Sequence, residues 1–176
     1  AYAASEKVTD QILEKADFDP TQRITTWGDW KKAVANGAGM LVLMPHTTPK
    51  PPALEISGHK LHRSRITNPY VTADPEVVRP AVVLFGCDTG GQQEDPVGYV
   101  TRFFERDAGV VFGSFSLLRA GTAAVLASRL VSALRDPNQA GQPVGRVLTG
   151  VRRDALHDGG WAALAMTAFG DSNWEV

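Results

Sequence analysis

Three short, unbroken apolar runs constrain the fold of this chain more than any other feature. They are GMLVLMPH, AVVLF and GVVFGSFS, which begin at Gly39, Ala81 and Gly109. A strand with both faces buried has a nearly continuous apolar sequence, whereas a strand with one face in water alternates apolar and polar residues. The runs therefore predict buried strands of a mainly parallel sheet.

Segments with helical periodicity lie between and around these runs. Apolar side chains recur every three to four residues within residues 121–134 and 144–151. A capping box over residues 26–29 predicts the start of another helix, which Asn36 and Gly37 end. Helices that alternate with strands predict an α/β fold with helices on both faces of the sheet.

Four further segments have weaker signals. We expect a first helix over residues 5–15, a short strand at RITTW, a loop-rich stretch from Thr47 to Val78 with one small strand at LEISG, and either a strand or a helix at WAALAMTAF.

Length, charge and cysteine content limit the classes of protein. The 176 residues predict one domain over residues 1–176, and the net charge of -1 gives no reason to expect direct binding of nucleic acid or of an anionic membrane. No apolar stretch approaches the roughly 18 residues that span a bilayer, and the first residues do not resemble a signal peptide. The single cysteine excludes an internal disulfide and suits the reducing cytoplasm, where we expect the protein.

His46 and Cys87 both follow directly after a predicted strand. The carboxyl ends of strands are where α/β sheets collect reactive groups. An imidazole can remove the proton of a thiol and later deliver it to a leaving amine, and a lone cysteine with a distant upstream histidine is a known arrangement for this chemistry. The alternative is that Cys87 is a small buried apolar residue and that His46 is structural.

Longer stretches around these two residues resemble a known family. The sequences LVLMPHTT…ALEIS, PAVVLFGCDTGG, FFERDAGVVFGSFSLLRAGTAAVLASRLVSAL and GRVLTGVRRDALHDGGWAALAMTAFGDSNWEV are similar to the CHAT domain of the caspase-like (clan CD) cysteine peptidases, from about Leu41 to the C-terminus. The resemblance implies a caspase-like α/β sandwich and a His–Cys dyad that hydrolyses peptide bonds through a thioester acyl-enzyme. His46 falls on the catalytic histidine of the family and Cys87 on its nucleophile.

The resemblance also implies roles for residues beside the dyad. The amides of Cys87 and Thr47 would form the oxyanion hole, although the family usually has glycine where this chain has Thr47, and a β-branched residue does not easily adopt a positive φ. Ser114 and Ser116 would bind the backbone of a substrate, or else only continue a strand. Asp88 would shape a pocket for a basic side chain, or else cap the turn after the nucleophile.

Cofactor sites are not indicated. His59 and His62 are separated by two residues in a proline-rich stretch, which lacks the geometry of a helical zinc motif, so we interpret them as exposed loop histidines. GGQQED does not have the pattern of a phosphate-binding loop. We therefore expect neither a metal nor an organic cofactor.

The residues predict a nucleophilic cysteine beside a histidine, and the resemblance implies a cysteine endopeptidase that cleaves a protein partner in bacterial defence or regulated cell death. Because the chain starts at Ala1, we expect a C-terminal fragment or a processed chain, whose other partners are regions or chains of the parent protein. One alternative is a catalytically inactive CHAT-type module that binds a protein partner. A weaker alternative is a flavodoxin-like domain that binds a ligand.

Overall fold

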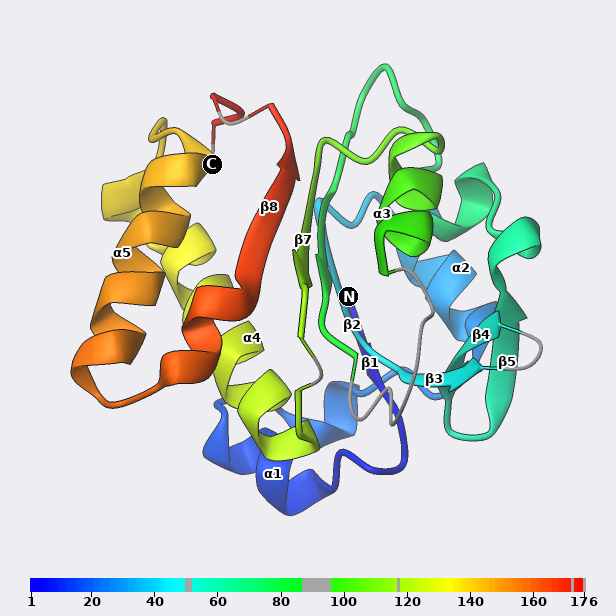
Figure 1. Ribbon diagram of the computed structural model, residues 1–176. Coiled ribbons are helices and arrows are strands. Elements are labelled where there is room, and N and C mark those ends of the chain that lie inside the picture. The colour runs from blue at the N-terminus through cyan, green and yellow to red at the C-terminus, as the bar shows by residue number, and fades with distance from the viewer. Residues whose placement is uncertain (50–51, 87–95, 117, 172, 176) are drawn as a thin grey trace.

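A five-stranded sheet lies between two layers of helices in the computed structural model (Figure 1). The structure describes residues 1–49, 52–86, 96–116, 118–171 and 173–175. The strands of this central sheet are, in spatial order, β1 (Tyr2–Ala4), β2 (Met40–Met44), β6 (Ala81–Leu84), β7 (Val110–Ser114) and β8 (Met166–Gly170). The first four strands are parallel, and β8 runs antiparallel to β7. The mainly parallel sheet predicted from the apolar runs is confirmed.

Helices cover both faces of the central sheet, as the sequence predicts (Figure 1). One layer consists of α1 (Asp10–Lys15), α4 (Ala120–Arg135) and α5 (Val144–His157), and the other contains α2 (Trp27–Ala35) and α3 (Pro96–Phe104). Short 3-10 helices connect the longer elements: η1 (Pro20–Gln22), η2 (Arg63–Arg65), η3 (Asn68–Tyr70), η4 (Pro137–Gln139) and η5 (Trp161–Ala165).

The strands divide their side chains between two hydrophobic cores. In β2, Val42 and Met44 join the core beneath α1, α4 and α5, whereas Leu41 and Leu43 join the core beneath α2 and α3. Successive side chains of a strand point to opposite faces, so an unbroken apolar run is what a strand between two cores requires.

A second, antiparallel sheet was not expected from the sequence. Its strands are β3 (His46–Pro49), β4 (Pro52–Ile56) and β5 (His59–His62). The prolines of this stretch suggested a loop with only one small strand, at LEISG, which lies partly in β4. In the structure, Pro49 ends β3 and Pro52 begins β4, positions where a strand tolerates proline. Buried side chains of β4 and β5 attach this small sheet to the α2 and α3 core.

Three expectations about other segments need correction. The first helix, α1, spans Asp10–Lys15 rather than residues 5–15, because a turn in which the Val8 amide donates to the Ser5 carbonyl (3.0 Å) precedes its N-cap residue, Thr9. RITTW forms only an isolated bridge between Ile24 and Ala3. WAALAMTAF is divided between η5 and β8, so each of its two interpretations holds for one half.

No helix within the described ranges combines the length and the apolar character needed to cross a membrane.

Thr26 caps the start of α2, as the sequence predicts, but the Asp29 carboxylate accepts from the Thr26 hydroxyl rather than from the Thr26 amide. The Thr26 hydroxyl accepts a hydrogen bond from the Asp29 amide (3.1 Å) and donates one to the Asp29 carboxylate (2.8 Å). Thr9, the N-cap residue of α1, makes no such side-chain bond. The two threonines therefore form a matched pair: both are N-cap residues, but only Thr26 makes the capping hydrogen bond.

Replacing Thr26 with alanine is expected to lower the free energy of unfolding by about 1 kcal/mol, because the Asp29 amide loses its acceptor. Thr9→Ala is expected to change it by less than about 0.5 kcal/mol. Urea unfolding at equilibrium measures both values. Equal losses in the two variants would contradict the assignment of the cap to α2.

Candidate functional site

His46 lies at the carboxyl edge of the central sheet, between the two sheets. It comes two residues after the end of β2 and is the first residue of β3, where its backbone lies opposite Glu55 of β4. The side chain is partly buried, and its Nδ1 atom is buried without a hydrogen-bond partner among the residues that the structure describes. A buried polar atom without a partner costs free energy, so this ring nitrogen is a candidate to bond another group.

The register of β2 and β6 matches the spacing of the predicted dyad. Met40 pairs with Ala81 and Leu43 with Leu84, an offset of 41 positions (81 minus 40). The Phe85 amide, which donates to the Leu43 carbonyl (3.0 Å), continues the pairing beyond β6. His46 and Cys87 are separated by the same 41 positions (87 minus 46). The sequence spacing of the predicted dyad therefore equals the offset of the two neighbouring strands that precede it.

Cys87 and Asp88 themselves lie outside the described residues, and Gly86 is the last described residue before them. The pairing of Cys87 with His46 and the role of Asp88 stay predictions from the sequence.

Thr47 follows His46 within β3 and lies opposite Leu54 of β4. It is not among the described non-glycine residues that have a positive φ, which are Asp17, Ser57 and Asp107. Thr47 thus has the backbone that a β-branched residue favours, rather than a positive φ. Its contribution to an oxyanion hole stays a prediction.

Ser114 and Ser116 lie at the carboxyl end of β7, on the same edge of the sheet as His46. The Ser114 hydroxyl donates to the Ser116 carbonyl (2.9 Å) and accepts from the Ser116 amide (3.2 Å). β6 lies between β7 and β2, so two strand spacings, on the order of 10 Å, separate the ends of these two strands. The structure places both serines on the predicted edge and also gives the Ser114 hydroxyl a local role in the turn.

His59 and His62 lie on β5, so their interpretation as loop residues is wrong. Hydrogen-bonded pairing with β4 makes a strand of this stretch, which the nearby prolines had hidden. Over the described part of the chain, no cluster of three or more histidine, cysteine or acidic residues is arranged to hold a metal ion.

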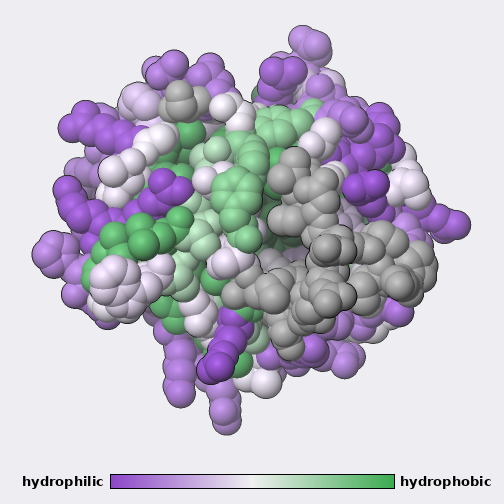
Figure 2. All heavy atoms as spheres, in the orientation of Figure 1, coloured by the Kyte–Doolittle hydropathy of each residue, from purple (hydrophilic) through white to green (hydrophobic). Residues whose placement is uncertain are grey.

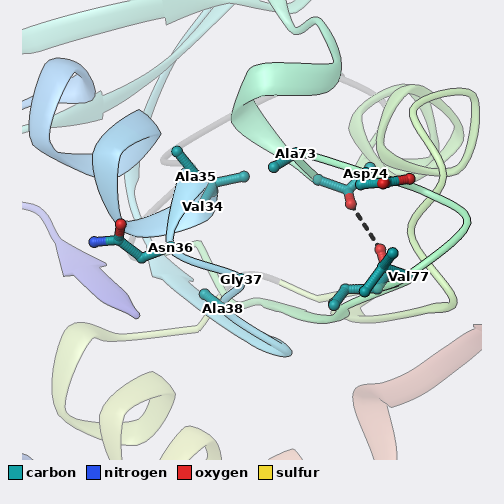
Figure 3. A pocket seen from close by; sticks show the side chains of 10 residues that line it. Val34, Ala35, Asn36, Gly37, Ala38, Ala73, Asp74 and Val77 are labelled. Atoms are coloured by element: carbon teal, nitrogen blue, oxygen red, sulfur yellow. Dashed lines mark hydrogen bonds between the residues drawn. The ribbon is translucent and has the colours of Figure 1, made fainter.

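A pocket of about 400 Å³ opens at the opposite edge of the sheet (Figure 3). The end of α2 and the residues leading into β2 form one wall, and residues 72–78, which precede β6, form the other. Both walls are at the amino ends of strands, whereas His46 follows the carboxyl end of β2. The pocket is mainly apolar and is separate from the predicted dyad.

Sequence reasoning missed an aromatic pair at the carboxyl edge. Phe115, which follows Ser114, is 63% exposed, and its ring packs edge-to-face on Phe169 of β8 at a centroid distance of 5.4 Å. In the sequence Phe115 continues the apolar pattern of the third run, which predicts a buried residue. The exposure of Phe115 follows from the end of β7 at Ser114. The sequence does not mark this end, because the apolar pattern continues past it.

Comparison with known protein families and with curated proteins finds no match to this chain.

The two serines can be separated by substitution. Ser114→Ala is expected to lower the free energy of unfolding by about 1 kcal/mol, because the hydroxyl makes both bonds of the turn. Ser116→Ala is expected to change it by less than about 0.5 kcal/mol, since Ser116 contributes only backbone groups to these bonds. Urea unfolding of both variants measures the difference. A larger loss in Ser116→Ala would show that the turn is held in another way.

Proposed function

We propose that this chain is a caspase-like cysteine endopeptidase of CHAT type, with His46 and Cys87 as its dyad. The observation that carries the proposal is the common offset of 41 positions, which the β2–β6 register and the His46–Cys87 spacing share. Paired residues of neighbouring parallel strands lie about 4.8 Å apart, and His46 and Cys87 follow β2 and β6 in the sequence by two and three residues. The buried Nδ1 of His46, which has no hydrogen-bond partner among the described residues, adds support, because a thiol beside it would supply one.

The reaction proceeds in two steps that share one tetrahedral geometry. The Cys87 sulfur attacks the scissile carbonyl carbon, a C–S bond forms, and the carbonyl oxygen becomes an oxyanion near the amides of Cys87 and Thr47. The C–N bond then breaks as the imidazolium of His46 gives its proton to the departing amine, which leaves a thioester. Water next attacks the thioester carbon and passes a proton to His46. The C–S bond breaks, which releases the acid and restores the thiolate–imidazolium pair.

The fold and composition are compatible with this assignment. A mainly parallel sheet with helices on both faces is the coarse form of the caspase-like sandwich. We assign the enzyme to the cytoplasm and to bacterial defence or regulated cell death, with a protein substrate and no cofactor, on the resemblance and the single free cysteine.

The second candidate function is that of an inactive CHAT-type module that binds a protein partner. Thr47 favours it, because its position belongs to glycine in the family and its backbone does not have a positive φ. An intact dyad would favour the peptidase, and its absence would favour the binding module.

Alkylation of Cys87 tests the dyad without a substrate. An imidazole that stabilises the thiolate raises its fraction at neutral pH, so His46→Ala is expected to slow the reaction of native Cys87 with iodoacetamide by about tenfold. His59→Ala, which removes an exposed histidine of β5, is the matched control and is expected to leave the rate unchanged. Mass spectrometry of the labelled peptide measures the rates. Equal rates in all three proteins would refute the dyad and favour the binding module.

Peptide-bond cleavage tests the reaction itself. The full chain and its Cys87→Ala variant are incubated with a cell lysate, and new protein N-termini are identified by mass spectrometry. We expect a small set of cut sites with the full chain that is missing with the variant, because the thiol is the nucleophile. Identical sets of N-termini would contradict the endopeptidase.

A further inference from the structure

Exposed apolar side chains gather where β7 ends and β8 begins. Across the described ranges, the large apolar side chains that are exposed are those of Val77, Phe115, Val125, Trp161 and Leu164. Phe115 follows β7, and Trp161 (74% exposed) and Leu164 (59% exposed) belong to η5, which leads into β8. Scattered exposed apolar residues are ordinary, but grouped ones mark interaction sites.

A backbone hydrogen bond brings the end of η5 beside Phe115. The Phe115 amide donates to the carbonyl of Ala165, the neighbour of Leu164 in the chain (3.0 Å). A 3-10 helix has three residues per turn, so Trp161 and Leu164 lie on one face of η5. On the other side, Phe115 packs on Phe169. Figure 2 shows apolar surface in the middle of the face that carries β7 and β8 in Figure 1.

This surface lies at the edge of the central sheet that His46 occupies. β6 and β7 pair with an offset of 29 positions (110 minus 81). Gly86 and Phe115, which follow the ends of these two strands, are separated by the same 29 positions (115 minus 86). Phe169 packs against the core beneath α2 and α3, which also contains Leu54 of the small sheet. The aromatic pair and the strand that begins with His46 are therefore on the same side of the central sheet.

We infer that Phe115, Phe169, Leu164 and Trp161 form a docking strip for the substrate, which is an extended polypeptide segment with apolar side chains next to the scissile bond. The inference rests on the proposed function, because the strip is assigned to substrate by its place on the edge of the sheet that His46 occupies. Apolar side chains laid on the strip remove its exposed area from water, and the aromatic rings provide large, rigid contact surfaces. Polar side chains gain no such burial.

Binding to a variant without the nucleophile tests the strip apart from the chemistry. The full chain with Cys87→Ala is titrated into two fluorescein-labelled peptides of equal length, one with leucines and one with serines at the same central positions. Fluorescence anisotropy is expected to show about tenfold tighter binding of the leucine peptide. Equal affinity for the two peptides would overturn the inference.

Substitutions on the Cys87→Ala background locate the binding site. Phe115→Ser and, separately, Leu164→Ser are expected to reduce or abolish the preference for leucine, whereas Phe115→Leu is expected to retain most of it. Val77→Ser is the matched control, because Val77 is 75% exposed but lines the pocket at the opposite edge. Circular dichroism checks that each variant is folded. The strip would be overturned if the preference for leucine survives both Phe115→Ser and Leu164→Ser. It would also be overturned if Val77→Ser removes that preference as fully as they do.

The remaining outcomes separate this inference from the proposed function. If the leucine peptide binds through Phe115 but His46→Ala does not slow alkylation of Cys87, the strip stands as a binding surface and the peptidase fails. If alkylation depends on His46 but the peptides bind equally, the peptidase stands and the strip is overturned. Sedimentation tests a third outcome, in which the chain is a dimer. If Phe115→Ser dissociates this dimer but the leucine peptide does not, a second copy of the chain covers the strip and the inference is wrong.

Discussion

The parallel pairing of β2 with β6 is the constraint on which the rest of the structure depends. Both strands are central, and their side chains fill two cores at once, so each has apolar neighbours on every side. Their register determines which residues of the two strands lie side by side at the carboxyl edge of the sheet. A slip of one residue would move one strand end by about 3.3 Å and turn its side chains to the other face. The register that pairs Leu43 with Leu84 is also the observation on which the proposed dyad depends.

His46 is held from both directions along the chain, which suits a residue that must keep a fixed orientation. β2 precedes His46, and His46 is the first residue of β3. Buried side chains attach the small sheet that contains β3 to the core beneath α2 and α3. The indole of Trp27, on the first turn of α2, donates to the His59 carbonyl of β5 (2.9 Å). The Thr26 cap, α2 and the small sheet thus form a continuous support for His46, and a site on such rigid elements keeps its geometry better than one on a free loop.

Sequence patterns predicted the parts of the fold whose signals are local. The apolar runs yielded β2, β6 and β7, and the Leu126, Leu130 and Leu134 repeat yielded α4, because a continuous run and a 3.6-residue period are visible without partners. The small sheet was missed since its strands exist only through pairing with each other, and the prolines beside them resemble a loop. For the site, the sequence placed His46 and Ser114 at strand ends, but the exposure of Phe115 depends on where β7 stops and on what β8 brings beside it.

The direction of β8 decides which edge of the sheet has the apolar strip. Because β8 is antiparallel to β7, its first residue, Met166, pairs with Ser114, and η5 is therefore returned to the edge that His46 occupies. A parallel last strand would have placed η5 at the amino edge, near the pocket that Val77 lines. The guanidinium of Arg152, on α5, donates to the Met166 carbonyl and fixes the start of β8 against that helix. Leu164 and Trp161 belong to η5, which leads into β8. β8 is anchored on both sides, by the backbone of β7 and by Arg152 of α5, and it therefore holds η5 at this edge. Chain direction, rather than local sequence preference, brings the apolar surface and the candidate catalytic histidine to one edge.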